Sequence, residues 1–139
     1  MNILIIDAQG GGIGRALVAA VRQNIPAAEI TAVGTNSVAT SAMIKAGAHH
    51  AATGENAVIV GCRTADVIAG PVGIVIADAL FGEISAAMAA AVGQSRAKRV
   101  LIPVSQCGNL VVGVNDKSIS VLVQDAVSSI KVLCEGQTN

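Results

Sequence analysis

The stretch ILIIDAQGGGIGRAL, residues 3–17, decides the fold class that the sequence predicts. Residues 3–6 are an unbroken run of isoleucine and leucine, which is typical of a strand buried on both faces. Four of the five residues at positions 10–14 are glycines, and apolar residues recur after them at helical spacing. The stretch therefore predicts a buried strand, a glycine-rich loop and a helix, with Asp7 at the end of the strand.

Strand-like and helix-like patterns alternate along the remaining chain. This alternation favours a mostly parallel sheet with helices on both faces. We expect a single α/β domain over residues 1–139, with a doubly wound sheet of about five or six strands. The further predicted strands lie near residues 29–33, 49–52, 66–69 and 99–104, with a short one at 110–114, and the further helices begin near residues 36, 55, 84 and 119.

The composition predicts an apolar surface. Of the 139 residues, 53% are hydrophobic and 13% are charged, and Phe81 is the one aromatic residue. So few charges leave apolar surface exposed, and we expect a homo-oligomer to bury part of it. Nine basic residues balance nine acidic ones, and no stacking aromatics accompany the basic side chains, so a nucleic-acid partner is not expected.

The sequence also favours a cytoplasmic protein without a membrane partner. The longest apolar run, residues 67–77, is broken by Pro71 and is too short to span a bilayer. The chain starts with a strand rather than with a basic segment and a cleavage site. Its three cysteines show no CxxC spacing and leave one over in any pairing, which fits reduced thiols.

Glycines mark a candidate ligand site. In a doubly wound sheet, the loops after the first and fourth strands flank one crevice, and both loops are glycine-rich here. Glycines leave room for a ligand to approach the free N–H groups of a helix N-terminus. We therefore predict that the chain binds a nucleotide or another small ligand at this crevice. The candidate binding residues are Asp7, Gln9, Gly10, Gly11, Gly12, Ile13, Gly14, Thr35, Asn36, Gly70 and Gly73.

The first glycine loop resembles the TGxxxGIG turn of short-chain dehydrogenases, with residues 12–14 at the end of the motif. That resemblance implies NAD(P) or another nucleotide as the cofactor. Ala8 stands in place of the motif's first glycine, and the chain has no tyrosine for a Tyr-x-x-x-Lys pair. No carboxylate follows the second strand, where Thr35 and Asn36 remain to bond a ribose. A dehydrogenase of this kind is excluded.

Six segments spread over nearly the whole chain carry a second resemblance. They are DAQGGGIG, GTNSVATSAMIKAGA, TGENA, GPVGIVIADALFGEIS, QSRAKRVLIPV and VVGVNDKSIS. Together they resemble a family of short bacterial proteins that is catalogued as a domain of unknown function. The resemblance implies a Rossmann-like fold and no particular reaction.

Asp7 has three possible roles. A carboxylate about 5 Å from a phosphate would cost about 3 kcal/mol at an effective dielectric near 20, so the two do not sit together easily. Asp7 either accepts N–H groups of its own loop, or receives a hydroxyl or amino group of a ligand, or joins Asp78 or Glu83 in a metal-assisted site. No metal site follows from spacing alone, because the adjacent His49 and His50 would point to opposite sides of a strand.

Three functions stay open at this point. The first is a module that binds a nucleotide or dinucleotide, and the second is a small-molecule enzyme with a site around Asp7, Asp78 and Cys107. The third is a structural oligomer without a ligand. The sequence favours a buried or incidental role for Cys107, although a reactive thiol is the alternative.

Two further groups are expected to serve helix ends. Glu83 and Ser85 precede an alanine-rich helix and are expected to cap it. The basic run RAKR, residues 96–99, is expected to offset the dipole at that helix's C-terminus, with an anion-binding patch as the alternative.

Overall fold

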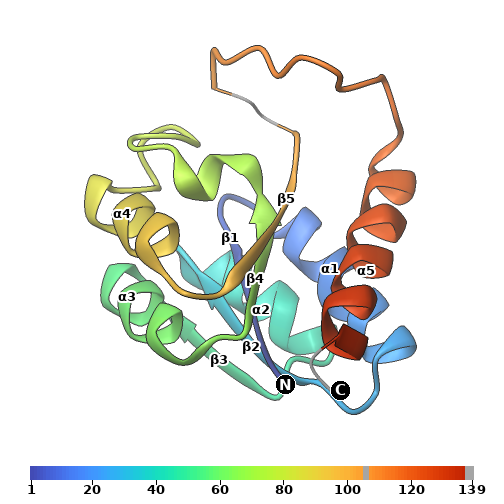
Figure 1. Cartoon of the computed structure of the whole chain (residues 1–139). Coiled ribbons are helices and arrows are strands. Elements are labelled where there is room, and N and C mark those ends of the chain that lie inside the picture. The colour runs from blue at the N-terminus through green and yellow to red at the C-terminus, as the bar shows by residue number, and fades with distance from the viewer. Residues whose placement is uncertain (105–106, 137–139) are drawn as a thin grey trace.

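The chain folds into one five-stranded sheet flanked by helices (Figure 1). This computed structural model describes residues 1–104 and 107–136. The strands lie in the order β3-β2-β1-β4-β5, and every neighbouring pair is parallel. This is the Rossmann-like order of a doubly wound sheet, and the predicted fold class is confirmed. The strands are β1 Asn2–Asp7, β2 Glu29–Gly34, β3 His50–Thr53, β4 Val67–Pro71 and β5 Lys98–Ile102, and the helices are α1 Gly12–Asn24, α2 Ser37–Lys45, α3 Glu55–Thr64, the short 3-10 helix η1 Val72–Val75, α4 Ala86–Gln94 and α5 Ile119–Gly136.

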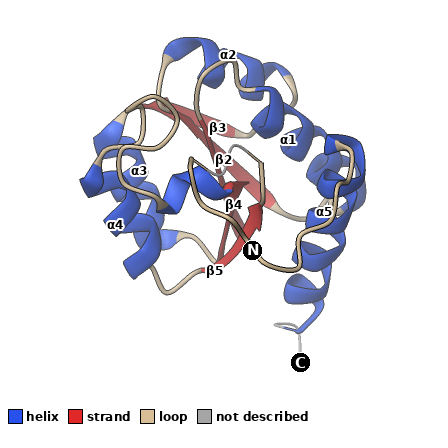
Figure 2. Cartoon of the chain, turned by 90° about the horizontal axis from the view of Figure 1, so that it is seen from above, coloured by secondary structure: helices blue, strands red, loops and turns tan. Residues whose placement is uncertain are grey.

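The sheet separates two apolar layers, because alternate residues of a strand point to opposite faces. Ile3 and Ile5 of β1 pack in the layer that contains residues of α1, α2 and α5. Leu4 and Ile6 pack in the other layer, with residues of α3 and α4. Figure 2 shows the resulting arrangement, with α1, α2 and α5 on one side of the sheet and α3 and α4 on the other.

The helix ends follow the sequence signals. The side chain of Asn36 accepts a hydrogen bond from the N–H of Ala39 at 2.9 Å and caps α2. Ser85 caps α4 in the same way, through the N–H of Met88 at 3.2 Å. The guanidinium of Arg99 donates to the carbonyl oxygen of Ser95 at 2.8 Å, so part of the basic run does serve the C-terminus of α4. The contacts of Ser85 and Arg99 confirm the predictions made for the two ends of α4.

The predicted strand at residues 110–114 is wrong. Residues 107–118 instead form an irregular connection on the way from β5 to α5, with turns at 107–108 and 112–113, and this connection stands away from the rest of the molecule in Figure 1. A strand forms only where a partner strand supplies its hydrogen bonds, and none of the described strands lies beside this segment. Cys107 is exposed there rather than buried, while the first two residues of the predicted SQCGN turn lie outside the described residues. Within the described part of the chain, no helix is both long enough and apolar enough to cross a membrane.

Candidate functional site

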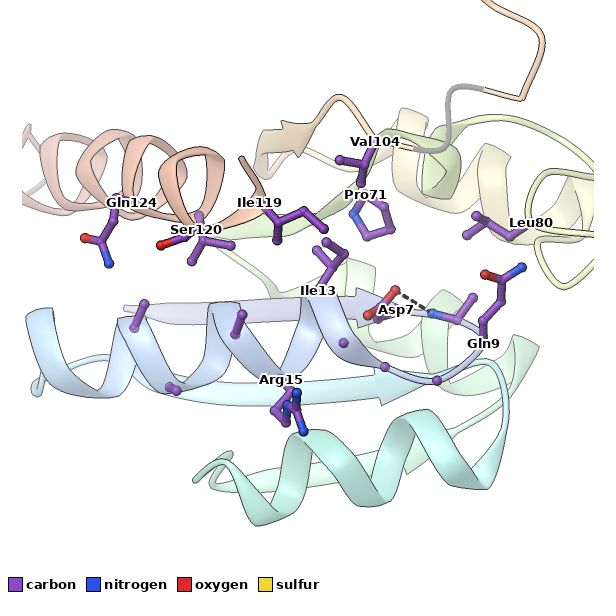
Figure 3. Close-up of a pocket in the computed structure, with 18 of the residues that line it drawn as sticks. Asp7, Gln9, Ile13, Arg15, Pro71, Leu80, Val104, Ile119, Ser120 and Gln124 are labelled. Carbon is purple, nitrogen blue, oxygen red and sulfur yellow. Dashed lines mark hydrogen bonds between the residues drawn. The ribbon is translucent and has the colours of Figure 1, made fainter. Parts of the chain in front are cut away.

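A crevice of about 680 Å³ opens at the carboxyl end of β1 and continues between α1 and α5 (Figure 3). Its volume lies in the range of about 300 to 1,000 Å³ that is usual for small-ligand pockets. One wall is the glycine loop with the first turns of α1, and the other is the start of α5. Of the residues predicted from the sequence, Asp7, Gln9, Gly10, Gly11, Gly12 and Ile13 line the crevice, whereas Gly14, Thr35, Asn36, Gly70 and Gly73 do not.

The wall formed by α5 was not predicted from the sequence. Ile119, Ser120, Val123 and Gln124 line the crevice from this helix, although they lie more than 100 positions after the glycine loop. Ser120 and Gln124 are four residues apart and therefore share one face of the helix. In the sequence, this polar pair beside the apolar face of the last helix was the signal that could have predicted the second wall.

Asp7 is buried beneath the glycine loop, and the residue as a whole, backbone included, is 4% exposed. One carboxylate oxygen accepts the N–H of Ala8 at 2.8 Å, and the other accepts the N–H of Gly14 at 2.6 Å. The first of the three readings of Asp7 is therefore confirmed, because its carboxylate fixes the loop and the first turn of α1. Burial raises the pKa of Asp7 above its ordinary value, even though these N–H donors favour the charged form.

Two glycines of the loop have no structural reason to be glycine. A Cβ atom added to Gly10 or Gly12 would meet nothing within 4 Å, and neither residue has a positive φ. Across the described part of the chain, their N–H groups have no hydrogen-bond partner. Gly11 differs, since its φ is 74° and an added Cβ would lie 2.8 Å from the Cα of Ala39. The loop therefore offers two open N–H groups to the crevice.

The other predicted glycines are fixed by packing. An added Cβ on Gly14 would lie 2.5 Å from the sulfur of Met43 and 2.8 Å from the Cβ of Asp7. On Gly70 it would collide with the carbonyl oxygen of Ile6, in the neighbouring strand β1. On Gly73 it would lie 3.1 Å from Leu80. Packing accounts for these glycines, and a ligand contact at any of them stays a prediction.

A carboxylate does lie at the end of β2, although none follows that strand in the sequence. Glu83 reaches this position from the segment between η1 and α4, and one of its oxygens accepts from Thr35 Oγ1 and Asn36 Nδ2, both at 2.7 Å. The same oxygen accepts the N–H of Gln9 at 3.1 Å. Burial pushes the pKa of Glu83 upward, but these hydrogen bonds together outweigh it and hold the pKa below its ordinary value. Glu83 does not cap α4, so that prediction is wrong; it ties the glycine loop to β2.

A second, smaller depression of about 390 Å³ adjoins the crevice and shares Gln9 and Leu80 with it. Asp78 and Cys107 line this depression and not the crevice that holds Asp7. Among the described residues, the five non-glycine residues with positive φ all line it; they are Gln9, Asp78, Leu80, Phe81 and Cys107. Such backbone strain collects at functional sites, and here it collects beside the glycine loop.

The charged groups around the crevice do not form a metal centre. Among residues 1–104 and 107–136, no group of three or more His, Cys, Asp and Glu side chains is placed to hold a metal ion. His49 and His50 contact separate partners, Arg22 at 2.7 Å and Glu29 at 2.7 Å. Arg15 borders the crevice, but Figure 3 shows its side chain directed toward α2.

Comparison with known proteins places the chain in a family. The family model described as "Domain of unknown function (DUF3842)" matches residues 2–135. The chain belongs to this family. A comparison of the DUF3842 chain with curated proteins finds no match. Among solved structures it is similar to a dodecameric FMN-dependent UbiX-like decarboxylase from Escherichia coli O157:H7, with a TM-score of 0.45 and 22% identity, covering 94% of this chain and 77% of that chain.

Proposed function

We propose that the chain binds a nucleotide or dinucleotide, of the NAD(P) class, in the crevice between the glycine loop and α5. The observation that carries the proposal is the pair Gly10 and Gly12, which neither backbone conformation nor packing requires to be glycine. Their unpartnered N–H groups lie at the N-terminus of α1, where the helix dipole favours an anion. A phosphate approaching these two residues would meet no side chain.

The same arrangement restricts where the phosphate sits. The carboxylate of Asp7 already accepts the N–H of Gly14, the third residue of α1, so this donor is not open to a ligand. The ligand phosphate is therefore held by the tip of the loop, whereas a pyrophosphate at a helix N-terminus with all its N–H groups free would also use those of the first turn.

The cluster at the end of β2 supports a ligand that carries a ribose. Dinucleotide-binding folds hold a ribose hydroxyl on a carboxylate at this point. Glu83 supplies a carboxylate here, and Thr35 and Asn36 orient it. The low pKa of Glu83 keeps it an acceptor for hydroxyl groups near neutral pH.

The absorption spectrum of the purified protein gives a first test. The chain contains no tryptophan and no tyrosine, so a bound nucleotide would dominate its near-ultraviolet absorption. Thermal unfolding with AMP, NAD, NADP and FMN extends the test, since a ligand at about 100 times its dissociation constant adds about 2.7 kcal/mol of stability. If no ligand co-purifies and none of these nucleotides raises the melting temperature, the proposal fails.

The variant Gly12→Ala tests whether the absence of a side chain at Gly12 serves ligand binding. We expect it to fold normally and to bind the identified nucleotide at least about tenfold more weakly, a loss of about 1.4 kcal/mol, because the new methyl group stands where the phosphate approaches. Gly93→Ala is the matched control, since this exposed helical glycine also has nothing within 4 Å and lies in α4, away from the crevice. Calorimetry that gives both variants the affinity of the unmodified protein would remove the glycine loop from the site.

A further inference from the structure

The most exposed large apolar side chains gather at one end of the molecule. Phe81, Leu110 and Val112 are 98%, 96% and 98% exposed. The depression beside the glycine loop is lined by both Phe81 and Cys107. Cys107 is the first described residue of the connection to α5. All three apolar residues thus belong to segments at the carboxyl end of the sheet, where the crevice also opens (Figure 1). An apolar group of this kind on a chain of ordinary size marks an interaction surface.

The connection at residues 107–118, which we call the arm, contains a turn at its apolar centre, where the N–H of Val114 donates to the carbonyl oxygen of Val111 at 3.4 Å. Its centre, LVVGV at residues 110–114, is rich in β-branched residues, which favour strands. Every residue from 107 to 121 is exposed. The arm also leaves from β5, an edge strand of the sheet. An exposed apolar segment of this kind is suited to packing against another chain.

We propose that the arm and the loop around Phe81 form the contact between two copies of this chain. About a two-fold axis the same surface of each copy faces the other, so the exposed apolar side chains of one arm can pack on those of the second arm. The fifteen consecutive exposed residues, with the exposed positions around Phe81, approach the roughly 20 residues per partner of a standard interface.

Charge favours a second copy over other occupants. Residues 107–115 contain no charged side chain, and the chain has zero formal net charge, so two copies meet without repulsion. An anionic membrane surface requires a cluster of basic residues. The arm has one lysine, Lys117, and this residue is paired with Asp125 at 2.9 Å. The basic run at residues 96–99 lies at the start of β5, the opposite end of the sheet.

The contact brings the second copy to the mouth of the crevice. Val104 precedes the arm and Ile119 follows it, and both line the crevice. A partner seated on the arm therefore narrows the opening and shields a bound ligand from water. The interface itself does not depend on the proposed nucleotide, so the two proposals fail separately.

The variant Val112→Asp tests the interface. We expect the unmodified protein to show at least twice the 13.8 kDa mass of one chain in size-exclusion chromatography with light scattering, and Val112→Asp to show the mass of one chain. The melting temperature should rise with protein concentration for the unmodified protein and stay constant for the variant. Val112 is 98% exposed, so circular dichroism should report an unchanged fold.

Val132→Asp is the matched control. Val132 is also exposed, at 67%, but it lies near the C-terminal end of α5, away from the arm. This variant should keep the oligomeric mass. A monomeric unmodified protein at high concentration, or a Val112→Asp protein that keeps its oligomeric mass, would overturn the proposal, and so would dissociation caused equally by Val132→Asp.

Discussion

The two glycine-containing loops at the carboxyl end of the sheet look alike in sequence and differ in structure. In the loop after β1, Gly10 and Gly12 face open space and leave their N–H groups without partners in the described chain. At the end of β4 and in η1 the glycines are enclosed: Gly70, within β4, lies against the backbone of β1, and Gly73, within η1, packs on Leu80. The fold does not require Gly10 and Gly12 to be glycine. It does require small residues at positions 70 and 73, because neighbouring segments pack closely there.

The difference shows that a glycine is informative about ligands only when the fold does not account for it. The glycines at the end of β4 and in η1 let η1 and the following loop approach the sheet, and this brings Glu83 to the end of β2. Of the two segments, the loop after β1 is the one whose glycines, Gly10 and Gly12, have N–H groups open to the crevice. Substitutions that add a single methyl group can separate the two situations.

The largest effect is expected for Gly70→Ala. Its new Cβ would collide with the carbonyl oxygen of Ile6, and neither central strand can move without breaking the sheet. We expect the free energy of unfolding to fall by about 3 kcal/mol, at the upper end of overpacking effects. Urea unfolding followed by circular dichroism measures it. Gly73→Ala should cost much less, because the side chain of Leu80 can shift by a few tenths of an ångström; equal losses would contradict the packing argument.

An intermediate effect is expected for Asp7→Asn, which loses an acceptor for one of two buried N–H groups. This should cost about 1 kcal/mol at low pH, where the hydroxyl oxygen of the protonated carboxyl group accepts weakly but the amide nitrogen of Asn does not accept at all. The pKa of Asp7 is raised in the folded state, so its contribution to stability is complete below about pH 4 and is lost as the pH rises through the folded value. The stability advantage of the unmodified protein over Asp7→Asn should therefore shrink from pH 4 toward neutral pH.

Urea unfolding of both proteins across this pH range measures the difference in their free energies of unfolding. The titration of groups that both proteins share cancels in this difference. An advantage that grows toward neutral pH would mean that the N–H donors outweigh burial at Asp7. The loop would then carry a fixed negative charge beside the proposed phosphate site.

The smallest effect on stability is expected for Gly12→Ala. Its methyl group meets nothing, and alanine is a better helix former than glycine, so stability should stay constant or rise by less than about 1 kcal/mol. Gly93→Ala should behave in the same way, and thermal unfolding of the two variants side by side is sufficient to compare them. A loss of stability at Gly12 alone would mean that the loop needs this glycine for folding, and the difference between the two loops would disappear.

Prediction from the sequence succeeded where the signal was local. The run at residues 3–6, the capping residue Ser85 and the alternation of strands and helices identified the parallel sheet and its helices. It failed at residues 110–114, where apolar β-branched residues indicate a strand but no partner strand is adjacent. It also missed the position of Glu83, because its contact with Thr35 joins residues 48 positions apart.

The sequence by itself determined the fold class and the end of the sheet at which we propose a ligand site, because hydrophobic periodicity and glycine-rich turns act over a few neighbouring residues. The tertiary structure alone decided which glycines are filled by packing and which face the crevice. It also decided that Asp7 fixes its own loop and that α5 forms the second wall. The physical reason is that burial and open space depend on which distant segments meet, and only the folded chain brings those segments together.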